Sequence, residues 1–554
     1  MKNVLIAGLI VMALASSSHD FSLRAAQSTA IARTKYEIPF LSDKTYENPL
    51  YDIKYFKTTF ISPTGKTNTV HGFWDGDLNW KVRFQPAETG NWTYSTACSD
   101  TANSGLHGRT GSFRCEATHS ELDIYRRGQI AHPVGTYHLA HADGTPFFWT
   151  GCTAWNGALL STDQEWDKYL SQRAETGYNV IQFVTTQWRG CEADINGQVA
   201  FTGSGRIDIN PEFFRRLDKK IDDINAHGLV AAPVVLWALP FGQGRHLSPG
   251  YYLPQEEAIL LARYIVARFG ANHVVWVLGG DGRYVDEYEQ RWKEIGRGVF
   301  GAGEHQGLVS QHPHGRSWIG SAYRDEAWLD VIGYQSSHGN NENVVNWINR
   351  GPPSQQWSRL SPRPIINMEP NYEEIFFKIT ARDVRNASYW SMLATPAAGI
   401  TYGAYGIWPW LQEGNPIQNH GSPSVEGKEY TPWYDSIYFP GSLQVGYLAE
   451  FFRKLQWWHL RPSPELLNGQ PGDKVFNHHI SVAATSDKAL IVAYLPVQSD
   501  IDLLNPFNEK YDAQWFDPVE NKYIPAQASY PSGLVRLSSP KDQDMLLILR
   551  KLDR

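Results

Sequence analysis

Cysteine is scarce in this sequence, with only four residues in a chain of 554. Four cysteines are too few for the disulfide frameworks of small secreted domains, and these four are not spaced as zinc ligands. Cys98 and Cys115 lie close together in a segment of predicted strands and could pair. Cys152 and Cys191 could pair only if the fold brings them together. The sequence therefore predicts neither a disulfide scaffold nor a structural zinc site.

Long apolar runs and nucleotide-binding motifs are also missing. No segment has 18 uninterrupted apolar residues, the minimum for a membrane-spanning helix. The GxSxG motif, the P-loop and a GxGxxG motif followed by an acidic residue are absent, which leaves serine-hydrolase, nucleotide and dinucleotide chemistry without support. The net charge of −7 gives no indication of nucleic acid or anionic membranes as partners.

Aromatic residues, in contrast, are abundant: they make up 13% of the chain, with 21 Trp and 28 Tyr. Large cores in β-rich domains account for many of them. Carbohydrate binding is the other explanation, because sugar rings present C–H faces that pack against aromatic faces. Composition alone leaves both explanations open.

The first residues have the pattern of an export signal. Lys2 supplies a positive charge, residues 4–15 form a short apolar run, and Ala13-Leu-Ala15 is a small-x-small cleavage site. No cysteine follows for a lipid anchor. We therefore expect residues 1–15 to be a signal peptide, and the mature protein to be secreted or periplasmic, with no membrane contact after cleavage. The sequence does not indicate an oligomeric state.

Two segments are predicted to be β-sandwiches. In residues 36–118, Trp80, Val82 and Phe84 alternate with charged residues, which is typical of half-buried strands. Residues 456–554 contain further short strands separated by turn residues. The chain has no low-complexity linker and no internal repeat. We therefore expect the two sandwiches and the segment between them to pack as one rigid unit.

Between them, residues 128–455 alternate strands with helices. Thr162 and Glu165 form a capping-box pattern at the start of one helix. The pattern predicts an α/β fold, a (β/α)8 TIM barrel flanked by the two sandwiches. The eight predicted strands are residues 146–150, 179–184, 229–237, 274–278, 307–310, 329–334, 364–368 and 397–402.

Polar and aromatic residues follow the predicted barrel strands. Because the carboxyl ends of barrel strands converge on one pocket, we expect these side chains to bind substrate. They are Trp155, Asn156, Gln187, Trp188, Trp237, His312, His338, Tyr402 and Trp408.

Two carboxylates stand directly at strand ends, Asp281 after the fourth strand and Glu369 after the seventh. Glycoside hydrolysis uses such a pair, one as proton donor and one as nucleophile or base, and a separation of about 5–5.5 Å indicates retention. Asp281 could instead cap a helix or pair with Arg283, and Glu369 could form a salt bridge with Arg382 or Arg385. Further carboxylates nearby are expected to be solvated: Asp286, Glu287, Glu373 and Glu374.

Evidence for metal binding is weak. His312 and His314 are two residues apart, but no third ligand has a matching spacing, and Asp194-Ile-Asn-Gly is only a fragment of a calcium loop. We therefore predict no metal and no cofactor.

Three motifs resemble a known family: Trp276-Val-Leu-Gly-Gly-Asp281, Asn367-Met-Glu-Pro-Asn-Tyr372 and Gly399-Ile-Thr-Tyr402 with Ile407-Trp-Pro-Trp410. They are similar to the apiosidase-like barrels of glycoside hydrolase family 140, with a DUF4038-type barrel. The segment around Trp92 resembles the DUF5060-type N-terminal β-sandwich that accompanies such barrels.

The resemblance implies Asp281 as acid/base and Glu369 as nucleophile of a retaining enzyme that acts on plant or algal polysaccharide, with apiose removal as the attested activity. An Asp departs from the commoner Asn-Glu pair of related barrels. Because Asp is shorter than Glu, its backbone must lie closer to the substrate, which Gly279 and Gly280 permit. A non-catalytic carbohydrate-binding protein is the alternative, and a polysaccharide lyase or a metal hydrolase is a third.

Overall fold

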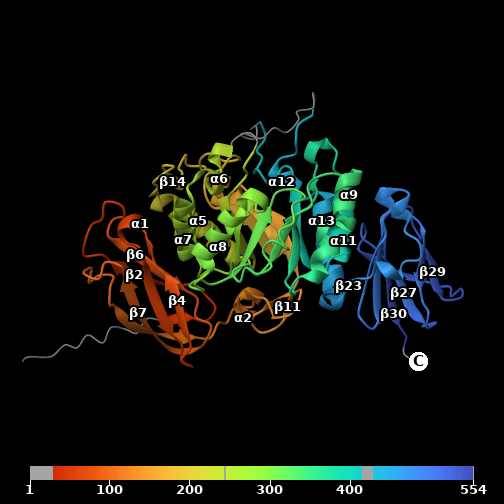
Figure 1. Ribbon diagram of the computed structural model, residues 1–554, viewed down its shortest axis with the longest axis horizontal. Coiled ribbons are helices and arrows are strands. Elements are labelled where there is room, and N and C mark those ends of the chain that lie inside the picture. Colours follow the sequence, from red (N-terminus) through yellow and green to blue (C-terminus); the bar gives the residue numbers. More distant parts are fainter. Residues whose placement is uncertain (1–28, 242–244, 415–427, 553–554) are drawn as a thin grey trace, which may run out of the picture.

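The computed structural model describes residues 29–241, 245–414 and 428–552. The segment that we interpret as a signal peptide lies outside these residues. Figure 1 shows three parts in a row: an N-terminal β-domain, a central barrel and a C-terminal β-domain. Among the described residues, no helix is both long and apolar enough to cross a bilayer.

The central part is a barrel of eight parallel strands, which confirms the predicted fold class. The sheet is closed by a parallel bridge between Ser310 and Val331. The first strand begins at Trp149, three residues later than predicted, because Pro146 and Phe147 form β11 (Pro146–Phe147) of a separate antiparallel sheet. In chain order the barrel strands are β12 (Trp149–Thr153), β13 (Val180–Val184), β16 (Val230–Trp237), β17 (Val275–Gly282), β18 (Leu308–Pro313), β19 (Ile332–Gln335), β20 (Ile365–Glu369) and β22 (Ala397–Ala404).

Helices cover the outside of the barrel. Thr162 caps the first of them through the predicted box: its hydroxyl accepts from the Glu165 N–H, and the Glu165 carboxylate accepts from the Thr162 N–H. No helix follows β18, although all of residues 314–331 are described. The helices are α4 (Asp163–Glu175), α5 (Pro211–Ala226), α7 (Gln255–Phe269), α8 (Glu289–Phe300), α9 (Glu342–Arg350), α10 (Pro352–Gln356), α11 (Ala381–Ala394) and α13 (Pro440–Lys454).

The N-terminal domain consists of a five-stranded and a three-stranded sheet. The first strand among the described residues, β1 (Thr29–Ile31), pairs in parallel with β8 (Thr110–Glu116) and lies before residue 36, where the domain was expected to start. The remaining strands are β2 (Tyr36–Leu41), β3 (Phe56–Ile61), β4 (Thr67–His71), β5 (Phe73–Trp74), β6 (Asn79–Phe84) and β7 (Gly90–Cys98).

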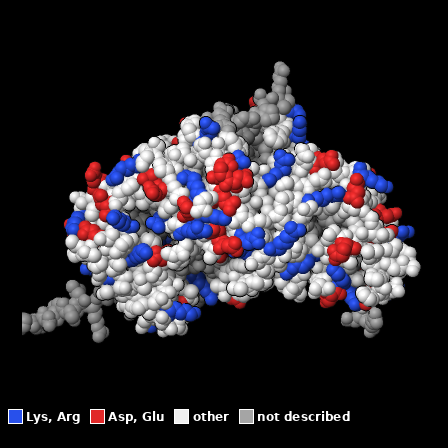
Figure 2. Space-filling view, viewed as in Figure 1, with Lys and Arg blue, Asp and Glu red and all other residues white. Residues whose placement is uncertain are grey.

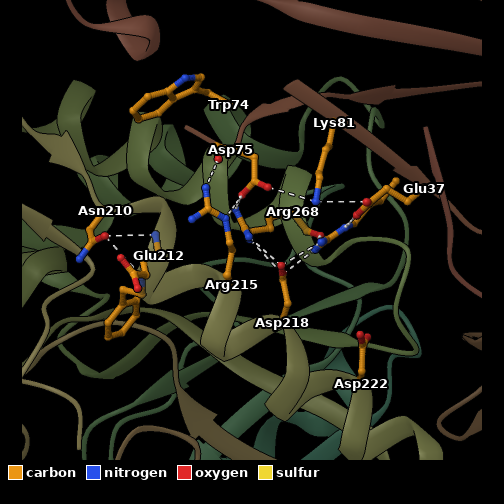
Figure 3. A network of polar contacts seen from close by, with 12 residues as sticks. Glu37, Trp74, Asp75, Lys81, Asn210, Glu212, Arg215, Asp218, Asp222 and Arg268 are labelled. Atoms are coloured by element: carbon orange, nitrogen blue, oxygen red, sulfur yellow. Dashed lines mark hydrogen bonds and ion pairs between the residues drawn. The ribbon is translucent and has the colours of Figure 1, made fainter. Parts of the chain in front are cut away.

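Buried charges join this domain to the barrel. Arg83 on β6 and Arg268 on α7 both donate to Asp218 on α5, and Arg268 also donates to Asp75 at 2.8 Å. Figure 3 shows Asp218 and Arg268 in the network that includes Asp75, Lys81 and Glu37. Arg268 is fully buried and Arg83 nearly so. The sandwich is therefore fixed to the barrel by paired charges.

The C-terminal domain contains a six-stranded and a two-stranded sheet. The larger sheet packs against the barrel helices. Arg385 on α11 forms a bidentate ion pair with buried Asp544, in which Nε donates to Oδ2 at 2.8 Å and Nη2 donates to Oδ1 at 2.6 Å. Its strands are β23 (Arg461–Pro462), β24 (Ser481–Ala484), β25 (Leu490–Leu495), β27 (Tyr511–Asp517), β28 (Lys522–Ala526) and β30 (Met545–Lys551), with β26 (Asp500–Leu504) and β29 (Leu534–Ser538) in the smaller sheet.

All four cysteines are buried free thiols, so neither of the pairings left open by the sequence is formed. On the face drawn in Figure 2, basic and acidic side chains are interspersed over all three parts. Neither sign of charge forms a continuous patch on that face.

Candidate active site

Asp281 stands near the carboxyl end of β17, in a strained backbone conformation. Its φ is +49°, a left-handed value that Asp tolerates better than most residues. The two preceding glycines are required by close packing, since a Cβ on Gly279 would lie 2.4 Å from the Tyr284 hydroxyl and one on Gly280 would lie 2.7 Å from the Trp237 ring. These two positions therefore exclude any side chain larger than a hydrogen atom.

Asp281 and Glu369 line the same cavity, of about 320 Å³, at the carboxyl ends of the barrel strands. The side chain of Asp281 is 16% exposed and that of Glu369 8%. Asp281 caps no helix, and Arg283 instead pairs with Asp286 and Glu287. The structure therefore excludes the alternative roles considered for Asp281.

Glu369 is held by three polar side chains and not by the arginines considered as alternatives. Gln335 donates to its Oε1 at 2.7 Å, and His338 Nε2 lies 3.0 Å from the same oxygen. His312 Nε2 lies 3.2 Å from Oε2, without the alignment of a hydrogen bond. Arg385 pairs with Asp544, and Arg382 donates to the Pro496 carbonyl.

The two carboxylates have opposite electrostatic environments. Burial raises the pKa of Asp281 to about 6, and the negative charge of Glu369 contributes to this rise. Burial alone would also raise the pKa of Glu369, but His312 and His338 outweigh that effect and hold the pKa well below its ordinary value of 4.5. Near pH 5, Asp281 is therefore protonated while Glu369 is ionised. Divergent pKa values of this kind separate an acid from a nucleophile.

Five of the nine predicted substrate-binding residues line the cavity. Four of them are aromatic and almost fully buried, and form its walls. Trp155 is oriented by a hydrogen bond from its Nε1 to the Tyr372 hydroxyl, at 2.8 Å. The five are Trp155, Trp188, Trp237, His338 and Trp408.

The other four do not line the cavity, which corrects the expectation for them. Asn156 lies behind the wall and accepts from Trp188 Nε1 at 2.7 Å. Gln187 holds a neighbouring loop through the Phe201 carbonyl and the Ala200 N–H. Tyr402 points away from the cavity and donates to Glu373, and His312 lies buried behind Glu369.

Glu373 differs from its expected solvated state. It is buried, accepts from Tyr402 at 2.8 Å and from the Gly441 N–H at 3.1 Å, and burial raises its pKa. Glu374 is bound by Thr431, whereas Asp286 and Glu287 are exposed as expected. Glu373 is therefore a structural group beneath the site.

Several cavity residues were not among the predicted ones. Gln335 and His314 belong to the polar strand exits that the sequence directs to one pocket, although neither is among the nine. Arg189 directly follows Trp188 in the sequence, and Tyr372 lies just after a strand end, so their positions offered a signal. Ile375 and Phe376 lie beyond β20 in a short 3-10 turn (Ile375–Phe377) for which the sequence has no recognisable pattern. The remaining unpredicted lining residues are Phe241, Gly315 and Ser337. Among the residues that the structure describes, no group of three or more His, Cys, Asp or Glu side chains could hold a metal ion.

The family profile described as "Apiosidase-like, catalytic domain" matches residues 134–459, which include the whole barrel and both carboxylates. The chain belongs to this family. The profile of DUF5060, a domain of unknown function, matches residues 34–99. No curated protein matches the chain. Family and fold together support a glycosidase.

Solved glycoside hydrolases share the fold of this apiosidase-like protein. One superposes with a TM-score of 0.65 at 23% identity, over 77% of this chain and 97% of its own. A glycoside hydrolase family 5 protein from Bacteroides vulgatus ATCC 8482 gives 0.65 at 22% identity, over 77% and 94%. A second structure from that organism gives 0.66 at 17% identity, over 95% and 100%. At these identities the similarity demonstrates the fold alone.

Proposed function

We propose that this protein is a secreted, retaining glycoside hydrolase that cleaves a glycosidic bond in a plant or algal polysaccharide. The observation that carries the proposal is the pair of cavity carboxylates with oppositely shifted pKa values. A protein that only binds carbohydrate has no need for such a pair. The aromatic walls supply faces on which a sugar ring packs.

In the proposed reaction, Asp281 donates its proton to the glycosidic oxygen as the bond to the anomeric carbon breaks. Glu369 attacks that carbon and forms a glycosyl ester. Asp281, now ionised, takes a proton from water, which displaces Glu369 and releases the sugar. The family resemblance makes apiose the first sugar to test.

The decisive experiment screens the protein against plant and algal polysaccharides with product analysis, followed by Asp281→Asn and Glu369→Gln on the active substrate. Each change should lower kcat by at least about 10³-fold, because it removes a group that acts in the transition state. Asp286→Asn is the matched control: this carboxylate is near the site in sequence but 65% exposed and outside the cavity. Ordinary turnover in either active-site variant would refute the assignment.

Two further measurements test the finer parts of the proposal. Proton NMR of the first product should show the same anomeric configuration as the substrate. Azide should restore turnover to Glu369→Ala by attacking the anomeric carbon in place of the carboxylate, which yields a glycosyl azide. Inversion would instead make Glu369 the base for a water molecule. N-terminal sequencing of the exported protein should locate cleavage after Ala15, and an intact Met1 would exclude the signal peptide.

A further inference from the structure

Asp281 and Glu369 are carried by strands that are not neighbours. Between β17 and β20 the closed barrel places β18 and β19. The register of β17 on β18 also shifts twice near Asp281, where Gly280 pairs with His312 and Gly282 with Pro313. A side chain on one of these two strands that contacts both residues would link the two carboxylates directly.

His312 is such a side chain. Its Nδ1 accepts a hydrogen bond from the backbone N–H of Asp281 at 3.1 Å, and its Nε2 lies 3.2 Å from Glu369 Oε2. The ring is fully buried, packs edge-on against Trp155 at 5.5 Å between centroids, and does not line the cavity. It is therefore placed to act on both carboxylate residues without touching substrate.

The contact with Asp281 determines which nitrogen carries the proton. A backbone N–H can only donate, so Nδ1 must be unprotonated, and a neutral ring then carries its hydrogen on Nε2. That hydrogen has Glu369 Oε2 as its nearby acceptor. The Nε2 atom lies within contact distance of this oxygen, although the two are not aligned as a hydrogen bond.

We propose that His312 is a positioning residue that couples the acid to the nucleophile, fixing the strained backbone of Asp281 through Nδ1 and orienting the Glu369 carboxylate through Nε2–H. The effect of His312 on catalysis rests on the proposed function. The contacts of its ring with Asp281 and Glu369 do not depend on that function. His312 thereby holds Asp281 at its φ of +49° and fixes one oxygen of Glu369, so that the other can accept from Gln335 and His338.

Two substitutions separate the two halves of this role. In His312→Asn, the amide oxygen can replace Nδ1 as acceptor, but the donor toward Glu369 is lost. In His312→Gln, the amide nitrogen can replace Nε2 as donor, but the acceptor for the Asp281 N–H is lost. His273→Gln is the control for loss of a buried imidazole, because His273 lies at the opposite end of the barrel and bonds to the Arg33 carbonyl.

The readout is the pH dependence of kcat/KM on the substrate found by the screen. His312→Asn should move the acidic limb, set by Glu369, to higher pH, while the alkaline limb stays in place. His312→Gln should move the alkaline limb, set by Asp281, and leave the acidic limb unchanged. Each should lower kcat on the order of 10²-fold, as misplacement of a catalytic group does. Wild-type limb positions in both variants would overturn the proposal, even if kcat fell.

A second measurement needs no substrate. In protein labelled with ¹⁵N-histidine, the His312 signals, assigned by their loss in His312→Asn, should have the shifts of a neutral ring protonated on Nε2 at pH 7. An Nδ1-protonated ring would refute the proposed link. If Asp281→Asn and Glu369→Gln stay active, the proposed function fails; if they are inactive but the His312 variants keep wild-type limbs, only the positioning role fails.

Discussion

Arg189 Nη2 lies 4.0 Å from Asp281 Oδ2, within the cavity and opposite in sign to the carboxylate. Burial and the charge of Glu369 raise the pKa of Asp281, and Arg189 is the first of the charges that oppose this rise. Two unit charges at this distance interact by about 1–4 kcal/mol, depending on how well water screens them. Arg189 therefore limits the rise in the pKa of Asp281 to about 6.

We expect Arg189→Gln to shift the alkaline limb of the kcat/KM profile to higher pH. Removing the cation destabilises the ionised form of Asp281, so the acid stays protonated over a wider range. The limb of the wild-type enzyme should lie near pH 6. Arg283→Gln is the control, because Arg283 pairs with Asp286 and Glu287 outside the cavity and should leave the limb unchanged. A shift to lower pH would contradict the role given to Arg189.

Asp281→Asn should make the folded protein more stable at neutral pH. The pKa of about 6, against an ordinary value of 3.8, means that ionising Asp281 costs the native state up to about 3 kcal/mol. Because the pKa is raised on folding, stability falls as pH rises through this window. Asn is neutral and tolerates a positive φ, so it removes the cost without new strain.

The measurement is the thermal midpoint of both proteins at pH 4 and pH 8. The gain in thermal midpoint should be small at pH 4, because Asp281 is still protonated in the native state at this pH. The gain should be largest at pH 8, where the native state carries the buried charge. Asp286→Asn provides the control, since Asp286 also has a positive φ, of 57°, but is 65% exposed. An equal gain at both pH values would show that charge is not the cause.

The sequence predicted the barrel and both carboxylates because these features depend on local signals. Continuous apolar runs ended by glycine mark buried parallel strands, as at residues 274–280, and the Thr162 box marks a helix start. Asp281 and Glu369 could then be placed at the carboxyl end of the barrel, because each follows a predicted strand directly. This placement does not depend on the register of the strands.

Which neighbouring side chains face the cavity could not be predicted, because successive residues of a strand point in opposite directions. A shift of one residue exchanges the cavity side for the wall side. His312 and His314 illustrate the difficulty: His312 lies within β18 and is buried behind Glu369, whereas His314 lies just beyond the end of that strand and lines the cavity. Tyr402 likewise faces Glu373. Register shifts depend on tertiary packing, which leaves no local pattern.

Asp218→Asn should strongly destabilise the junction between the N-terminal domain and the barrel. Asp218 accepts from both Arg83 and Arg268, whose side chains are 4% and 0% exposed. Without this carboxylate two buried cations lose their common partner, and breaking a buried pair costs about 3–5 kcal/mol. Urea denaturation should reveal this loss.

The pH dependence of this effect has a defined sign. The pKa of Asp218 is lowered: burial would raise it, but Arg83 and Arg268 outweigh burial. Its contribution is therefore complete above the ordinary value of 3.8 and is lost as pH falls through the folded pKa. Asp502→Asn is the control, because its partner Arg536 is 52% exposed and the pair should contribute less than about 1 kcal/mol. Equal losses in the two variants would refute the importance of burial.

Phe376→Gly should separate stability from substrate binding. Phe376 lines the cavity with φ +58° and ψ +16°, and its neighbours Glu374 and Phe377 also have positive φ. A non-glycine residue in this region costs about 1–3 kcal/mol, and such strain persists where the surroundings enforce it. Here Thr431 binds the Glu374 carboxylate, and Phe377 stacks on Tyr430 at 3.8 Å.

Glycine adopts this backbone without strain, so the thermal midpoint of Phe376→Gly should stay level or rise. The lost ring should raise KM while kcat changes little, because the phenyl group supplies binding surface and no proton. Phe377→Gly is the matched comparison: it relieves the same strain but loses the stack on Tyr430, and should lower the midpoint with KM unchanged. If Phe376→Gly instead lowers the midpoint and leaves KM unchanged, the ring stabilises its own segment by packing. The positive φ at residue 376 then has no role in substrate binding.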